Sequence, residues 1–175
     1  PEKVEKVMDK ILPHLSKNII QQAKTEGYQM VWVGGWRTAP CMISQQMWDR
    51  FVWPYLTQVV DEVIDSGLIP LLHLDSDWER ELERFKAFEP GKIILALDGD
   101  TDIFKAKKVL KDHACLMGDV PASLLAFGSP DEVVTYCKKL IKEIGPEGFI
   151  LQSGCDIPAN AKLENIQAMV AAVMN

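Results

Sequence analysis

Helical and extended patterns of hydrophobic residues alternate along this chain. Over residues 1–27, apolar side chains recur at the three- and four-residue spacing of an amphipathic helix, which Gly27 ends. The β-branched and aromatic run 28–33 then predicts a short buried strand, closed by Gly34 and Gly35. We therefore expect one helix followed by one strand.

The same step repeats further along the chain. Ser44 is a candidate cap for a helix that Gly67 ends and Pro54 bends. The nearly continuous apolar run 68–74 is typical of a strand covered by helices on both faces. Further helices are predicted at 78–88, 103–111, 129–144 and 163–173, and further strands at 92–97, 114–118 and 148–152.

Strict alternation with short connections indicates an α/β fold with a parallel sheet and right-handed crossovers. Two architectures fit: an open doubly wound sheet and a (β/α)8 barrel. Gly34-Gly35 is not the GxGxxG pattern of dinucleotide-binding folds, which weakens the first. A whole barrel needs about 250 residues and eight strands, so five strands are only part of one. In both architectures chemistry gathers at the carboxyl ends of the strands.

Composition narrows the class of protein. The 175 residues, 47% hydrophobic and 25% charged, suit one domain spanning 1–175. No apolar run reaches the roughly 20 residues of a membrane helix, and a net charge of -6 with scattered lysines argues against nucleic acid. Four distant cysteines and no leader pattern predict a reducing cytoplasm. Because the chain begins at Pro1 inside a helical pattern, we expect a fragment or a processed product.

The strand ends offer one candidate metal centre. His73 and Asp75 are two residues apart on an extended segment and so point to the same side, and Cys155 ends another strand that a barrel brings alongside. One nitrogen, one oxygen and one sulfur ligand with an open position would suit catalytic zinc. In the alternative, His73 bonds a backbone carbonyl, Asp75 caps the helix near Trp78, and Cys155 is inert in a turn.

Further polar residues follow other strands. Trp36 and Arg37 come after the first strand, and we predict that they bind the cofactor, Trp36 by contact with a flat ring. Asp119 is a candidate catalytic residue that either bonds substrate or simply ends its strand. Asp98 and Asp100 can equally be turn residues, which aspartate favours.

Several segments, in order along nearly the whole chain, carry a family resemblance. They are Ile43-Ser44 with Phe51 and Pro54-Tyr55, then His73, Gly118-Asp119-Val120-Pro121 with Leu124-Leu125, Gly128-Ser129-Pro130-Asp131-Glu132-Val133, and Gly154-Cys155-Asp156-Ile157-Pro158 with Glu164-Asn165. Together they resemble the uroporphyrinogen decarboxylase superfamily, including its cobalamin-dependent methyltransferase branch. The resemblance implies the C-terminal part of a (β/α)8 TIM barrel, with the first part of the barrel absent.

The residues around Cys155 bear on the branch. True decarboxylases resemble one another in a Gly-His-Gly setting near the last strand, where this chain has Gly154-Cys155-Asp156. The methyltransferase branch is similar to this chain in having a His on one strand and a Gly-Cys on the last strand. In that branch, zinc is held by His, Cys and Cys. His73 and Cys155 match that set, whereas Asp75 stands where the first Cys is usual. The resemblance thus implies zinc, and a methyl-corrinoid as substrate or partner-bound cofactor.

Three functions follow as hypotheses. The first is metal-assisted methyl transfer in corrinoid-linked one-carbon metabolism, with a corrinoid protein or a small-molecule methyl donor or acceptor as partner. Asp75 leaves the acceptor open: it need not be a thiol, and a methoxylated or methylamine-like donor or a folate acceptor is equally compatible. The second is uroporphyrinogen decarboxylation, which needs no metal. The third is a non-catalytic part of a barrel that associates with its missing half or with another copy.

Overall fold

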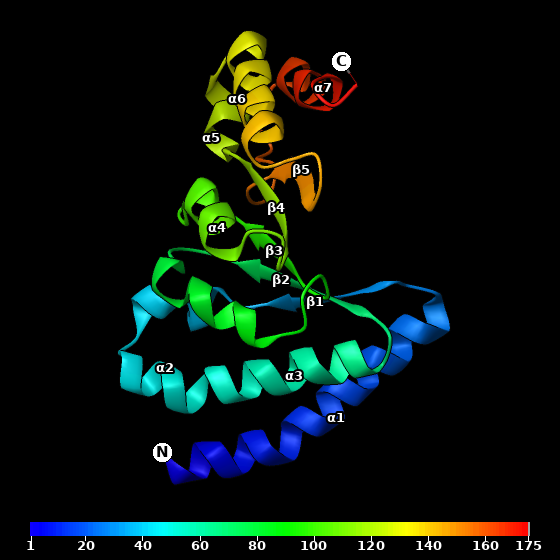
Figure 1. Ribbon diagram of the computed structural model, residues 1–175, viewed down its shortest axis with the longest axis vertical. Helices are drawn as coiled ribbons and strands as arrows, with labels where there is room; N and C mark the ends of the chain where they lie inside the picture. Colours follow the sequence, from blue (N-terminus) through cyan, green and yellow to red (C-terminus); the bar gives the residue numbers. More distant parts are fainter. Residues whose placement is uncertain (175) are drawn as a thin grey trace.

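One parallel sheet forms the centre of the molecule. The computed structural model describes residues 1–174, and the side chain of Trp36 lies outside the described part. Within this range the strands pair in sequence order, each parallel to the next (Figure 1). They are β1 (Met30–Gly34), β2 (Ile69–Leu74), β3 (Ile94–Leu97), β4 (Cys115–Val120) and β5 (Phe149–Ser153).

Helical segments connect the strands. The α-helices are α1 (Glu2–Glu26), α2 (Gln45–Phe51), α3 (Trp53–Asp65), α4 (Ile103–Leu110), α5 (Ala122–Phe127), α6 (Pro130–Glu143) and α7 (Leu163–Ala171). The 3-10 segments are η1 (Trp36–Thr38), η2 (Pro40–Met42) and η3 (Glu79–Ala87). Helices α1 and α3 pack together at the β1 end of the sheet, and α6 and α7 pack together at the β5 end (Figure 1). The predicted alternation of five strands with helices is confirmed.

The two faces of the sheet are covered differently. Alternate strand residues such as Leu72, Leu95 and Leu116 join helix residues in the main core, and all three are fully buried. On the opposite face, Leu71 and Ile94 belong to a small cluster that contains strand residues only. The expectation that 68–74 is covered by helices on both faces is therefore wrong, because the second face is the inner face of a partial barrel.

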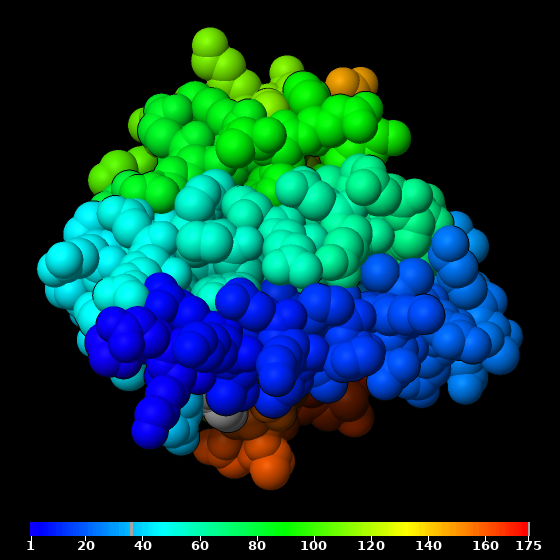
Figure 2. Space-filling view, turned by 90° about the horizontal axis from the view of Figure 1, so that it is seen from below, coloured from blue at the N-terminus to red at the C-terminus, as the bar shows by residue number. Residues whose placement is uncertain are grey.

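Helix α1 forms the outer layer beside α3 (Figure 2). Its buried residues include Ser16 and Ala23, which turn toward the rest of the molecule. A stripe of apolar side chains on α1 stays about half exposed: Val4, Val7, Ile11, Leu15 and Ile19. No helix in the described part of the chain is both long enough and apolar enough to cross a membrane.

Two predicted helices differ from the observed ones. The helix expected from Ser44 to Gly67 is two helices, α2 and α3, because Pro54 lies in the first turn of α3, where its missing N–H costs nothing. The segment expected as an α-helix at 78–88 is the 3-10 helix η3. Leu82 and Phe85 in this segment and Phe88 directly after it are three apart, which matches the three residues per turn of a 3-10 helix. Helix α5 was not predicted.

Candidate metal centre

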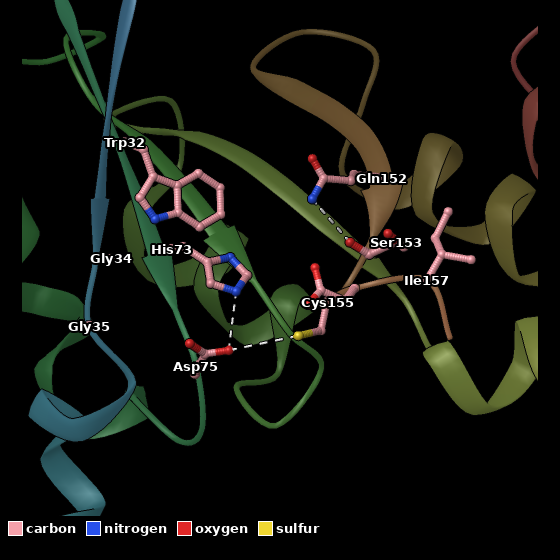
Figure 3. A pocket seen from close by; sticks show the side chains of 10 residues that line it. Trp32, Gly34, Gly35, His73, Asp75, Gln152, Ser153, Cys155 and Ile157 are labelled. Carbon is pink, nitrogen blue, oxygen red and sulfur yellow. Dashed lines mark hydrogen bonds and ion pairs between the residues drawn. The ribbon is translucent and has the colours of Figure 1, made fainter. Parts of the chain in front are cut away.

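His73 and Asp75 come from the carboxyl end of β2. Leu72 and Leu74 pack into the main core, so the alternation of the strand turns His73 to the inner face. Asp75 directly follows the strand and points to the same side (Figure 3). His73 Nε2 lies 3.1 Å from Asp75 Oδ1. The spacing of two residues therefore places both side chains in one cluster, as the sequence predicts.

Cys155 reaches the same cluster from the end of β5. Its Sγ lies 4.0 Å from Asp75 Oδ1, 80 residues away in sequence (Figure 3). Gly154 makes this approach possible, because a Cβ at that position would lie 2.4 Å from the backbone oxygen of Asp98. The end of β5 is also held against the end of β4, since the Gly154 N–H donates to the Val120 oxygen over 2.9 Å.

The geometry of these three residues fits a metal ion. One ligand atom from each of His73, Asp75 and Cys155 lies within 4.8 Å of the others. Zinc bonds of about 2.0 to 2.3 Å hold tetrahedral ligands about 3.3 to 3.7 Å apart, so the imidazole and carboxylate need little movement and the exposed thiol about 1 Å. Nδ1 of His73 is buried and lacks a hydrogen-bond partner among the described residues. Nε2, 3.1 Å from Asp75 Oδ1, is the ring nitrogen that faces the carboxylate.

A cavity of about 550 Å³ opens beside the three ligands. The Trp32 indole stacks on the His73 ring with centroids 4.8 Å apart and planes at 28°. That indole lies over Gly34, where a Cβ would be 2.7 Å from the indole nitrogen. The residues described as lining the cavity include no Lys or Arg: Trp32, Gly34, Gly35, His73, Asp75, Gln152, Ser153, Cys155, Asp156 and Ile157.

The structure does not show the alternative arrangement for His73 and Asp75. Among the described contacts, His73 is paired with the Asp75 carboxylate and with no backbone carbonyl. The backbone of Glu79 donates to Asp77 Oδ1 over 2.8 Å, so Asp77 takes the role expected of Asp75 at the start of η3. Asp75 is held through its backbone oxygen, which accepts the indole N–H of Trp78 over 2.8 Å. The Asp75 carboxylate remains directed at the cluster.

The family model for uroporphyrinogen decarboxylase (URO-D) matches residues 1–175, the whole chain. The chain belongs to the uroporphyrinogen decarboxylase family. This confirms the family predicted from the ordered sequence motifs.

Individual relatives agree with that assignment. A uroporphyrinogen decarboxylase of Coxiella burnetii (strain RSA 493 / Nine Mile phase I) is 28% identical over 139 residues, which are 77% of this chain and 37% of that protein. One from Chlorobaculum parvum is 24% identical over 178 residues, 99% of this chain and 49% of the relative. The chain thus spans less than half the length of these curated relatives.

A solved structure matches the fold. A methyltransferase from Methanosarcina mazei superposes with a TM-score of 0.73 at 22% identity, covering 90% of this chain and 46% of that protein. At this identity the likeness shows the fold alone. It confirms that the five strands and their helices correspond to about half of a URO-D-like barrel protein.

The structure does not bring Asp119 to the three-ligand cluster. Its side chain is buried at 3% exposure, and Oδ1 accepts the Tyr136 hydroxyl of α6 over 2.8 Å. Burial raises the pKa of Asp119 to about 6, against the opposing effect of the Tyr136 hydrogen bond. Asp119 is therefore paired with Tyr136 of α6 and is not among the described residues that line the cavity.

Trp36 and Arg37 stay predictions as cofactor-binding residues. Arg37 is exposed in η1 and is not among the described residues that line the cavity. The side chain of Trp36 lies outside the described residues. Among the described residues, Arg37 is not brought to the cluster.

Trp32 lines the cavity, although the sequence motifs give it no role at the site. Its side chain is 58% exposed, and its indole stacks on the His73 ring. The alternation along β1 could have revealed its direction, because Trp32 pairs with Leu71 and Gly34 with His73. Residues paired across a parallel sheet share a face, and Trp32 therefore lies on the inner face with His73.

Proposed function

We propose that this chain supplies the zinc-binding part of a methyltransferase in corrinoid-linked one-carbon metabolism. The observation that carries the proposal is the convergence of His73, Asp75 and Cys155 within 4.8 Å at one end of the sheet. Nitrogen, carboxylate and thiolate ligands with an open side are a donor set that zinc accepts. A corrinoid protein or a small methyl donor or acceptor would be the partner.

The chain's own residues would divide the work around such an ion. Asp75 and a deprotonated Cys155 would supply two negative charges, and neutral His73 would supply Nε2. When bound, zinc would supply Lewis-acid activation of the methyl donor or acceptor. Trp32 would limit the rotation of the His73 ring by stacking on it. The cavity beside the ligands would receive the reacting group on the open side of the cluster.

The charge of the cavity favours methyl transfer over decarboxylation in this half of the protein. Its lining contains Asp75 and Asp156 but, among the described residues, no cationic side chain. Uroporphyrinogen carries several carboxylates, which need cationic partners. A small neutral or cationic methyl compound suits this lining better.

Zinc stoichiometry in the full-length protein tests the proposal. We expect close to one zinc ion per chain in the wild type and loss of most of it in Cys155→Ala. Cys41→Ala is the matched control, because Cys41 is also an exposed free cysteine and belongs to no described metal cluster. Absence of stoichiometric zinc from the wild type, or full retention of it by Cys155→Ala, would refute the proposal.

Uroporphyrinogen decarboxylation is the second candidate, because the relatives named above are uroporphyrinogen decarboxylases. This reaction needs no metal. Turnover of uroporphyrinogen by full-length protein, unchanged after zinc removal by a chelator, would establish it and exclude the zinc-dependent proposal.

An association role is the third candidate. Strands β1 and β5 are the edges of the described sheet, and α1 carries an exposed apolar stripe. Unpaired edges and apolar patches favour association, with the remaining part of the barrel or with a second copy as partner. Light scattering on the isolated chain tests this, and a clean monomer would contradict it.

A further inference from the structure

The loop after β3 contacts two other loops. One follows β2 and carries Asp75, and the other follows β5 and carries Cys155. Asp98 begins this loop, and its Oδ2 accepts the backbone N–H of Ser76 over 2.7 Å. Ser76 directly follows Asp75 and has a φ of 66°, which residues other than glycine rarely adopt. The Asp98 carboxylate thus holds the chain at the point where it reverses after Asp75.

Thr101 completes the attachment of the loop after β2. Its fully buried hydroxyl donates to the Ser76 oxygen over 2.9 Å and accepts the Trp78 N–H over 3.0 Å. Trp78 in turn donates its indole N–H to the Asp75 oxygen. Four hydrogen bonds therefore run from residues 98–101 through Ser76 and Trp78 to the backbone of Asp75.

The same loop is in contact with the segment that carries Cys155. Gly154 lies against the backbone of Asp98, and a Cβ on Gly154 would be 2.4 Å from the Asp98 oxygen and 2.8 Å from its carbonyl carbon. The backbone of Asp98 therefore sets how close the Cys155 segment comes, while its carboxylate sets where Asp75 lies.

We propose that Asp98 and Thr101 are positioning residues, a clamp that fixes the spacing between Asp75 and Cys155 for metal binding. This inference rests on the proposed zinc-dependent function. Groups that orient metal ligands through hydrogen bonds typically change metal affinity by about 10- to 100-fold when they are removed. Neither residue touches the cavity, so both act through the ligands.

Zinc affinity of full-length variants is the first test. Asp98→Asn retains the shape of the side chain, but its amide must face either the Ser76 or the Asp100 N–H, both of which now donate to the carboxylate. We expect about 10- to 100-fold weaker zinc binding. Asp102→Asn is the matched control, since Asp102 lies in the same loop and accepts two backbone N–H groups within its own helix α4. We expect its zinc affinity to match the wild type within about twofold.

A second pair of variants covers the case in which Asp98→Asn fails to fold, which a thermal melt of the metal-free protein would reveal. Thr101→Val keeps the volume of the side chain and removes the hydroxyl, whereas Thr101→Ser keeps the hydroxyl. We expect Thr101→Val to bind zinc about 10-fold more weakly and Thr101→Ser to restore the affinity. Equal zinc affinity in folded Thr101→Val and Thr101→Ser would contradict the clamp.

A metal-free measurement separates the clamp from the proposed function. The imidazole NMR signals of His73, at fixed pH and without zinc, report the contact between His73 Nε2 and Asp75. We expect them to shift in Asp98→Asn and in Thr101→Val, and to stay in place in Asp102→Asn. The signals are assigned by their loss in His73→Gln.

The outcomes are distinguishable. If the wild type binds zinc and the clamp variants bind it equally well, the clamp is wrong and the proposed function stands. If the wild type binds no zinc, the proposed function fails, and the clamp fails with it as a device for metal binding. Shifted His73 signals would then show only that Asp98 positions Asp75, and unshifted signals would exclude even that.

Discussion

Strands β2 and β4 each end near an aspartate, and the two aspartates have different partners. Asp75 faces the inner side, 3.1 Å from His73 Nε2 and beside the cavity. Asp119 turns toward α6, where the Tyr136 hydroxyl donates to it and the core surrounds it. The same residue type therefore forms part of a candidate metal centre in one region and a buried polar pair in the other.

The difference teaches that direction, and not position at a strand end, makes a carboxylate available. On the inner side, the partners of Asp75 are residue types that can bind a metal ion, and one side of the cluster opens to a cavity. In the helix layer, Asp119 already has a hydroxyl donor, and its raised pKa follows mainly from lost hydration. The raised pKa of Asp119 therefore indicates that its carboxyl group is buried. The convergence of His73, Asp75 and Cys155 is what indicates a candidate metal centre.

The same substitution at Asp75 and at Asp119 should show the largest difference between the two regions. We expect Asp75→Asn to weaken zinc binding by at least about 100-fold, because a neutral amide replaces an anionic ligand. Asp119→Asn should leave zinc affinity unchanged. Isothermal titration of the metal-free full-length variants measures both values. A comparable loss in both variants would mean that the two regions belong to one site.

Gly154→Ala should disturb the inner region without removing a ligand. The added methyl group would meet the Asp98 backbone, so we expect about 1 to 3 kcal/mol of destabilisation together with weaker zinc binding. Denaturant unfolding of the metal-free protein measures the first effect. Cys155→Ala is the control: its side chain is exposed, so stability should change by less than about 0.5 kcal/mol while zinc is lost. A fully stable Gly154→Ala protein would show that the two loops can separate freely.

Local signals explain what the sequence could predict. The helix predicted at 129–144 is observed as α6, which begins with a capping box of Ser129 and Glu132, and β2 is one residue shorter than the predicted run 68–74. The meeting of His73, Asp75 and Cys155 follows from strand alternation and from the shared edge of parallel strands. Both rules depend only on residue spacing and strand order.

Features that depend on how loops pack were beyond the sequence. From the sequence alone, Asp98 is compatible with an ordinary turn residue. Only the structure shows that it contacts Ser76 and Gly154. The direction of Asp119 depends on Tyr136, which is 17 residues further along in a helix. The exposed position of Trp32 beside His73 depends on the register of β1 against β2, which local sequence patterns do not give.

The buried pair gives the smallest expected effect, a pH-dependent stability. The pKa of Asp119 is raised from 3.8 to about 6, so folding favours the protonated carboxyl group. Its contribution to stability is fully present below about pH 4 and is lost as the pH rises through about 6. Asp119→Asn cannot ionise, and above pH 7 it should be more stable than the wild type by about 1 to 3 kcal/mol.

Denaturant unfolding of the metal-free protein at a series of pH values checks this prediction. The advantage of Asp119→Asn should grow between about pH 4 and 7 and then level off. Asp98 and Asp102 also raise the pKa of Asp119 through their charges, whereas the Tyr136 hydrogen bond lowers it. Tyr136→Phe should therefore raise the pKa further and extend the loss of stability to higher pH. Parallel pH profiles for the wild type and Asp119→Asn would mean that Asp119 is solvated, and its contrast with Asp75 would disappear.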